Sequence, residues 1–173
     1  MRTSLRLAAV GMAVAAAALA SSAQAATATA DATATILSSL NVTNTAPLNF
    51  DTIAVNGAGT VVVATNGNIS CTVGALVCPG FAASAATFHV TGDTNTAVTV
   101  TLPTAGSTLT YVGWTGVGAA PTMSVDTWTS DFPNGNTLVG GAADVNVGGT
   151  LHVAAAQPAG SYAGTFDVQV QYQ

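Results

Sequence analysis

The stretch Tyr162-Ala163-Gly164-Thr165-Phe166-Asp167-Val168-Gln169-Val170-Gln171-Tyr172, which precedes the last residue Gln173, has side chains that alternate in character. Its even-numbered positions carry tyrosine, phenylalanine, valine or glycine, and its odd-numbered positions from Thr165 onward are polar. Because successive side chains of a strand point to opposite faces, this period of two predicts a half-buried antiparallel strand. No segment after residue 25 shows a convincing helical period. The end of the chain therefore predicts an all-β fold.

The same alternation recurs upstream, bounded by Gly, Asn, Asp and Pro residues. Further strands are expected at residues 48–55, 61–63, 87–91, 97–102, 109–111, 123–128, 145–147 and 151–153. Between the last two, Gly148-Gly149 predicts a tight hairpin turn. About eight short strands in one domain favour an antiparallel, Ig-like or pilin-like β-sandwich. We expect this domain to occupy residues 37–173.

The first 25 residues predict a signal peptide. Arg2 and Arg6 give a basic start, residues 7–20 are almost wholly apolar, and Ser22-Ala23-Gln24-Ala25 has the small-x-small pattern of a cleavage site. The apolar stretch is too short and too rich in alanine for a membrane span. We therefore expect an exported protein, in the periplasm, at the cell surface or outside the cell, and not an integral membrane protein.

Cleavage after Ala25 would change the charge of the chain. Arg2 and Arg6 are the two cations of the sequence, and its seven acids are all aspartates beyond residue 25. A mature surface without cations cannot release counterions from a phosphate backbone, which excludes nucleic acid as a partner. The same lack of cations argues against nucleotide, phosphate and anionic lipid ligands.

The two cysteines, Cys71 and Cys78, lie close together in the sequence. In an exported chain such a pair favours a local disulfide bond. A redox pair is normally spaced C-x-x-C, and a zinc site would need further ligands that are not nearby.

Residues 26–36 carry the alternation in a low-complexity form. Alanine and finally isoleucine occupy the even positions, which gives the donor-strand candidates Ala28, Ala30, Ala32, Ala34 and Ile36. Because threonine, at most of the odd positions, favours strands, the segment could form an N-terminal extension strand along an open sheet edge, in its own subunit or in a neighbour. The alternative interpretation is a flexible Ala/Thr linker.

Few ionisable groups are available for chemistry. His89 and His152 alternate with apolar neighbours, so both are expected to point outward from strands. No Gly-x-Ser-x-Gly motif supports a Ser–His–Asp site, and nothing in the spacing of the aspartates selects a pair of carboxylates. Asp93-Thr94-Asn95 is more typical of a hairpin turn than of a calcium loop. We expect no enzymatic activity, no cofactor and no metal site.

Trp114 and Trp128 lie in the most aromatic section of the chain. Large aromatic residues of a small sandwich usually belong to the core, because each buries much apolar area. If exposed, these two residues could instead stack on sugar rings, which makes them candidate ligand-stacking residues.

Three stretches and the cysteine pair carry a family resemblance. The stretches are residues 32–50 (ATATILSSLNVTNTAPLNF), residues 88–92 (FHVTG) and residues 160–172 (GSYAGTFDVQVQY). In this order they resemble an uncharacterised secreted bacterial family, the domain of unknown function numbered 4402. The resemblance covers essentially the whole mature chain.

More loosely, the layout is similar to chaperone–usher pilins and spore-coat-U-type domains. Those pilins lack one strand, and the N-terminal extension of a neighbour fills the groove, so the resemblance implies fibre assembly by strand donation. This sequence departs from the pilin pattern in two ways. Its extension carries alanines until Ile36 where pilins have bulky aliphatic residues, and both cysteines lie in the middle of the chain.

These observations predict a secreted structural or surface-associated subunit with fimbria-like assembly. Its partners would be copies of itself or related surface subunits, joined through residues 26–36 and a groove beside the C-terminal strand. The alternative prediction is a monomeric extracellular carbohydrate-binding β-sandwich with a glycan as its partner.

Overall fold

The computed structural model describes residues 25–173, so all of the expected signal peptide except Ala25 lies outside the described residues. Residues Ile36–Gln173 form one compact unit, and the residues before it belong to a separate unit. Of that separate unit, residues 25–35 are described; they contain no strand or helix, and their side chains are exposed. In the described part of the chain, no helix has the length and apolar character needed to span a membrane.

The all-β prediction is confirmed. Within residues 25–173 there are twelve strands, one short 3-10 turn at Val139–Gly141 and no α-helix. The strands are β1 (Asn41–Ala46), β2 (Ala54–Val55), β3 (Gly59–Val63), β4 (Ile69–Cys71), β5 (Leu76–Val77), β6 (Ala86–Thr91), β7 (Val98–Thr101), β8 (Ser107–Tyr111), β9 (Thr122–Ser130), β10 (Ala142–Val153), β11 (Tyr162–Ala163) and β12 (Gln169–Tyr172). All nine strand pairings are antiparallel.

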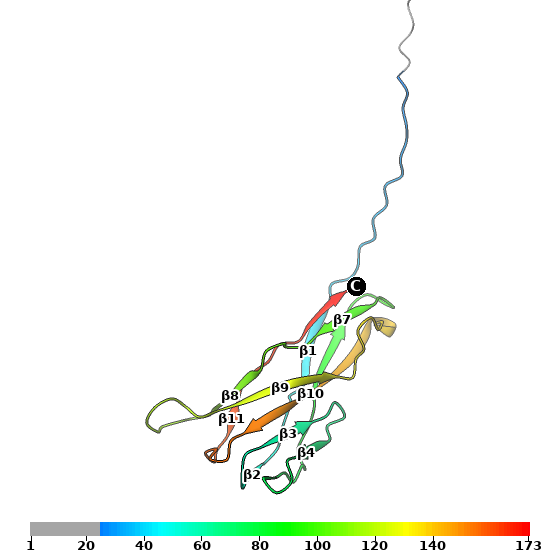
Figure 1. The fold of residues 1–173 in the computed structure, drawn as a ribbon. Coiled ribbons are helices and arrows are strands. Elements are labelled where there is room, and N and C mark those ends of the chain that lie inside the picture. The colour runs from blue at the N-terminus through cyan, green and yellow to red at the C-terminus, as the bar shows by residue number, and fades with distance from the viewer. Residues whose placement is uncertain (1–24) are drawn as a thin grey trace, which may run out of the picture. The chain divides into compact units, whose positions relative to one another are not determined.

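The largest sheet is built around β10 (Figure 1). Its main path runs β1-β6-β10-β9-β8-β11, and β3 and β4 extend it beside the second half of β10. The long strand β10 pairs with β6 through its first half, with β3 through its second half, and with β9 along its other edge. The long strand β10 is therefore central to the sheet, and its pairings set the register of β3, β6 and β9.

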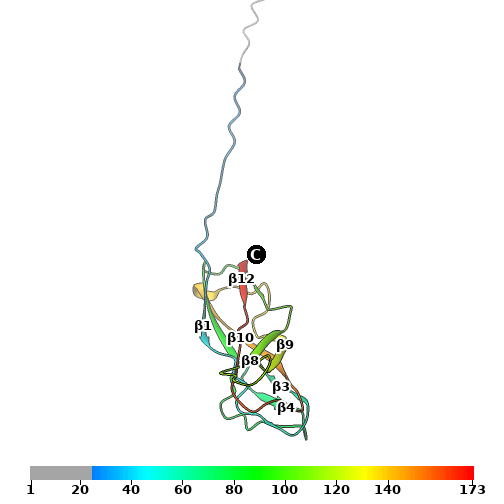
Figure 2. The ribbon, with the colours of Figure 1, turned by 90° about the vertical axis from the view of Figure 1, so that its left-hand side faces the viewer.

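The layer opposite the large sheet is discontinuous. Two separate two-stranded sheets, β12-β7 and β2-β5, form it. A first core, which includes Phe88, Val98 and Val145, contains buried residues of β6, β7 and β10. A second core, which includes Val61 and Leu151, is built from β3, β9 and β10 together with Phe50 and Leu76. The fold is therefore β-sandwich-like, with one continuous layer and one divided layer. Figure 2 shows β12 at one end of the compact unit and β3 and β4 toward the other.

The hairpin predicted at Gly148-Gly149 is wrong, because β10 continues through both glycines. Both residues are buried, and a Cβ atom at Gly148 would collide with the carbonyl oxygen of Val63 on the neighbouring strand. The pairing of β10 with β9 also shifts register between Gly148 and Thr150. These glycines thus permit the close approach of strands and a bulge, which are the other common reasons for glycine in a strand.

The side chains near the C-terminus alternate between half-buried and exposed, as predicted, but the backbone there does not form one continuous strand. Phe166, Val168 and Val170 are half-buried while the residues between them are exposed. However, β11 pairs with β8 and β12 pairs with β7, and residues 164–168 between these strands join no ladder. The chain therefore crosses from the edge of one sheet to another where one continuous strand was expected.

Candidate functional site

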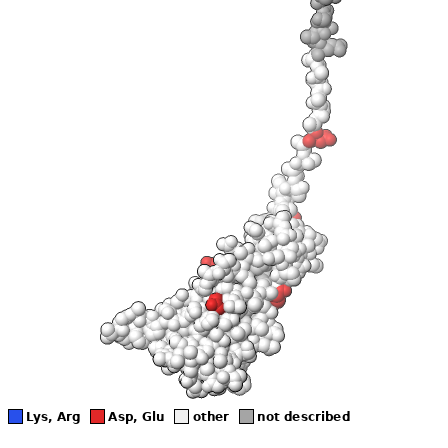
Figure 3. Space-filling model, in the orientation of Figure 1, with Lys and Arg blue, Asp and Glu red and all other residues white. Residues whose placement is uncertain are grey.

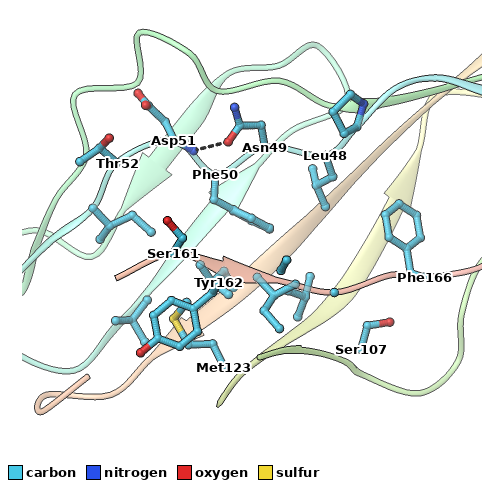
Figure 4. Close-up of a pocket in the computed structure, with 18 of the residues that line it drawn as sticks. Leu48, Asn49, Phe50, Asp51, Thr52, Ser107, Met123, Ser161, Tyr162 and Phe166 are labelled. Atoms are coloured by element: carbon cyan, nitrogen blue, oxygen red, sulfur yellow. Dashed lines mark hydrogen bonds between the residues drawn. The ribbon is translucent and has the colours of Figure 1, made fainter. Parts of the chain in front are cut away.

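An apolar groove of about 1080 Å³ lies between two segments of the compact unit (Figure 4). The first rim of this groove is residues 47–55, which lead from β1 into β2. The second rim is residues 157–166, which include β11. In the described part of the chain, no backbone hydrogen bond joins one rim to the other. The groove therefore separates two stretches of chain that are not paired with each other.

The floor of the groove is formed by the inner face of the large sheet. Apolar side chains of β6, β8, β9 and β10 line it: Ala86, Phe88, Leu109, Met123, Val125, Trp128, Leu151 and Val153. Leu48 on the first rim and Trp128 on the floor pack against both cores of the domain. The groove is thus a gap in the divided layer above a continuous apolar surface.

Aromatic side chains tie the second rim to this floor. The ring of Phe166 stacks on Trp128, with centroids 4.4 Å apart and planes inclined by 28°. Phe166 also meets the edge of Phe88 at 5.9 Å. Figure 4 shows Phe50 and Phe166 reaching inward from the two rims. The second rim therefore contacts the floor through its side chains while part of its backbone stays unpaired.

Both rims are paired on one side only. The first rim is joined to residues outside the groove by the Asn49–Ser84 bridge and by the pairing of β2 with β5. The second rim is joined to β8 through β11. Within the described residues, neither 50–53 nor 164–166 forms a backbone-to-backbone hydrogen bond. In the first rim, the N–H of Asp51 donates to the Oδ1 of Asn49 at 2.9 Å, and the N–H of Thr52 donates to the Asp51 carboxylate. The other backbone groups of 50–53 and those of 164–166 are of the kind that a sheet edge presents to an added strand.

Asp51 is the one carboxylate among the residues that line the groove. Its Oδ2 accepts a hydrogen bond from the backbone N–H of Ala82 at 3.2 Å. That bond, together with one from the backbone N–H of Thr52, lowers the pKa of Asp51 below its ordinary value of 3.8. Figure 4 shows its side chain directed away from Phe50. Asp51 therefore anchors the loop behind the first rim and does not place a charge on the groove floor.

The predicted disulfide between Cys71 and Cys78 is confirmed. Cys71 ends β4, and Cys78 follows β5 directly. Both cysteines pack against the second core. The bond therefore links the large sheet to the β2-β5 sheet that carries the end of the first rim.

The two tryptophans take different positions. Trp128 lies on the groove floor, whereas Trp114 lies in the loop between β8 and β9 and meets the ring of Tyr111 edge-on at 5.4 Å. Both side chains are half-buried. Among the described residues, the indole Nε1 of each has no hydrogen-bond partner and is shielded from solvent.

The donor-strand candidates Ala28, Ala30, Ala32 and Ala34 form no strand in the single chain, and Ile36 is 94% exposed. This alternating segment is therefore exposed in the single chain. Whether it pairs with a sheet edge stays a prediction.

Each histidine forms a cross-strand pair that the sequence did not reveal. Nδ1 of His89 on β6 lies 2.6 Å from Asp144 on β10, and Nε2 of His152 lies 2.8 Å from Asp126 on β9. Both histidines are exposed, as their alternation with apolar residues predicted. The hydrogen bond with His152 lowers the pKa of Asp126. These pairs connect neighbouring strands on the outer face of the large sheet, and only the register of the strands could have predicted them.

The described part of the chain carries few charged side chains, and all of them are aspartates. In the view of Figure 3 the aspartates are isolated among uncharged residues. In the part of the chain that the structure describes, no group of three or more His, Cys, Asp or Glu side chains is arranged to hold a metal ion.

Comparison with known proteins gives one match. The family model described as "Domain of unknown function (DUF4402)" matches residues 40–172. No curated protein and no solved structure matches the chain significantly.

Proposed function

This chain belongs to the DUF4402 family, and we propose that it is an exported structural or surface-associated subunit that assembles by β-strand addition. In this proposal, residues 26–36 of one copy lie in the apolar groove of another and pair with its rims. The domain would then resemble pilins in lacking one strand of its own. The observation that carries the proposal is an apolar groove with a stretch of backbone on each side, 50–53 and 164–166, that pairs with no other strand in the described chain.

The groove has the two properties that strand addition requires. Backbone groups on the rims can give an incoming strand its hydrogen bonds, and the apolar floor can receive every second side chain. Each backbone hydrogen bond contributes about 1 kcal/mol net, so pairing with two rims can supply several kcal/mol. An added strand would also make the divided layer continuous and cover the floor residues Leu109 and Met123.

The segment 26–36 has the properties of a donor. It alternates small apolar residues with threonines and Asp31, so one face is apolar and the other is polar. Each alanine methyl contributes only about 0.8 kcal/mol on burial. The backbone hydrogen bonds would therefore supply much of the affinity, and the rims are where those bonds would form.

Export is part of the proposal. The basic start, apolar stretch and small-x-small site of residues 1–25 favour passage through a membrane, followed by cleavage. The Cys71–Cys78 disulfide is consistent with an oxidising compartment such as the periplasm or the cell exterior. We propose a non-catalytic role, in which the two His–Asp pairs link strands on an exposed sheet face.

The glycan-binding alternative receives less support. Sugar stacking needs an aromatic face open to solvent. The face of Trp128 is covered by Phe166, and Trp114 is half-buried beside Tyr111. Strand addition is therefore the function that the geometry favours.

Deletion of residues 26–34 from the mature protein tests strand addition. Size-exclusion chromatography with light scattering should show oligomers or fibres for the intact mature protein and monomers for the deletion variant. A matched control replaces Thr27 and Thr29 by serine, which keeps the length and the alternation and should assemble normally. Assemblies that persist after the deletion, or an intact protein that stays monomeric at all concentrations, would contradict the proposal.

A further inference from the structure

We infer that the apolar groove selects the added strand by the size of its side chains and accepts a strand whose inward side chains are alanines. The strand that fits is residues 26–36 of another copy, so that copies of this chain join head to tail. This inference rests on the proposed function and deepens it. It names the occupant, the face of the occupant that enters, and the polarity of the assembly.

The size selection follows from what already fills the space between the layers. Large side chains project into this space from the acceptor itself: Phe50, Phe88, Trp128, Tyr162 and Phe166. The stacked pair of Trp128 and Phe166 spans from the floor to the second rim. Because packed layers interdigitate large residues with small ones, a strand added over this floor should carry small inward side chains.

Residues 26–36 meet this requirement with one face. Every even position from Ala26 to Ala34 is alanine, so the backbone can approach the rims without displacing the aromatic side chains. The other face carries Thr27, Thr29, Asp31, Thr33 and Thr35. Asp31 would then point to solvent, so neither a buried charge nor an approach to the carboxylate of Asp51 is required.

Ile36 sets the register of the added strand. A shift by two residues keeps alanines inward and changes only the position of this one large side chain. Ile36 is 94% exposed and is both the last residue of the segment and the first residue of its own compact unit. It would therefore pack at the end of the acceptor groove, where a large residue does not need to fit beneath the stacked rings.

The polarity follows from where the chain enters the compact unit. The carbonyl of Ser38 accepts a hydrogen bond from the Tyr172 hydroxyl at 2.8 Å, which holds the entry point beside the end of β12. The chain then runs through β1, about 20 Å at the usual rise of a strand, before the first rim begins at residue 47. Figure 1 shows β2 and β11 at the opposite end of this unit from the C-terminus. The chain thus enters the compact unit at the end opposite β2 and β11, and the contact between copies would join two different surfaces. Such a heterologous contact links subunits head to tail, in a chain or a ring.

A size exchange in the full mature chain tests the inference. Ala30→Leu enlarges one inward side chain, and Thr29→Leu is the matched control that places a leucine on the outward face. Ala30→Leu should raise the concentration needed for assembly about tenfold or more, because overpacking is costly, whereas Thr29→Leu should change it little. The second variant, Ala30→Leu combined with Met123→Ala, should assemble at a lower concentration than Ala30→Leu alone, because the loss of the Met123 side chain enlarges the groove. No gain over Ala30→Leu would count against size selection.

Two results would overturn the size selection. One is assembly of Ala30→Leu at the wild-type concentration, and the other is an equal loss in Ala30→Leu and Thr29→Leu. With either result, strand addition itself remains supported if deletion of residues 26–34 still abolishes oligomers. Electron microscopy of the wild-type assembly tests polarity separately, since closed two-fold dimers in place of linear chains or rings would contradict the head-to-tail arrangement. Thermal unfolding of each variant confirms that the domain itself has folded.

Discussion

The ring of Phe166 lies stacked on the indole of Trp128, with the two ring centroids 4.4 Å apart. Phe166 belongs to a stretch with no backbone partner in the described chain, while Trp128 belongs to β9 in the large sheet. The stacking therefore holds the second rim in place where hydrogen bonding does not. We expect Phe166→Ala to lower the free energy of unfolding by about 2–3 kcal/mol, below the full range for buried phenylalanine because this ring is half-buried.

Chemical denaturation of the non-assembling variant lacking residues 26–34 measures this loss without interference from oligomers. The neighbouring Thr165→Ala removes an exposed side chain and should change stability little. Equal stabilities for the two variants would show that the stacked pair does not hold the rim.

The disulfide gives a second prediction. Cys71–Cys78 closes a short loop between β4 and the residue after β5, and on the chain-entropy model its loss should cost about 2–3 kcal/mol. The paired replacement of both cysteines by serine should lower the melting temperature, and a reducing agent should then have no further effect on this variant. If complete reduction of the disulfide leaves the melting temperature of the wild type unchanged, the prediction is contradicted.

Acid should remove the contribution of Asp51. Its pKa lies below 3.8 in the folded protein, chiefly because the Ala82 N–H binds the ionised carboxylate. A pKa that is depressed by folding stabilises the fold above the unfolded-state pKa, and this stability is lost as the pH falls through the folded-state pKa. At neutral pH, Asp51→Asn should therefore have a lower melting temperature than the wild type. This difference in melting temperature should disappear as the pH falls below 3.8.

The control for this series is Asp167→Asn, since Asp167 is exposed and its carboxylate accepts no hydrogen bond in the described structure. Thermal melts across the pH range compare the two variants with the wild type. If the difference in melting temperature between Asp51→Asn and the wild type is the same at all pH values, the effect of the substitution does not come from the charge of Asp51.

The alternation of the sequence predicted the fold class because it reports burial directly. Val168 and Val170 face inward and Gln169 and Gln171 face outward, as a period of two requires. Pairing partners are a different matter, since nothing local in residues 164–168 shows that the chain changes sheets there. The candidate site was predicted only as a groove beside the C-terminal strand. The sequence predicts a strand over residues 48–55, which include most of the other rim, but only Ala54 and Val55 of this segment form a strand.

The structure at Gly148-Gly149 differs from the turn that the sequence predicts. Gly148-Gly149 has the composition of a tight turn, yet it lies inside the longest strand. The reason is a contact distant in sequence, the carbonyl of Val63 against Gly148. We expect Gly148→Ala to cost about 1–3 kcal/mol through overpacking, as measured by denaturant unfolding. Gly57→Ala is the control, because a Cβ atom there would make ordinary contact at 3.5 Å, and equal effects of the two variants would contradict the packing argument.

Tryptophan fluorescence can report strand addition at the groove itself. Trp128 lines the groove and Trp114 does not, and these are the two tryptophans of the chain. In Trp114→Phe, where Trp128 is the remaining emitter, assembly should shift the emission to the blue and reduce quenching by acrylamide, because the added strand covers the floor. In Trp128→Phe the emission of Trp114 should stay the same on assembly. If Trp128 is quenched equally in monomers and assemblies, the strand does not enter this groove, and the subunits must meet through another surface.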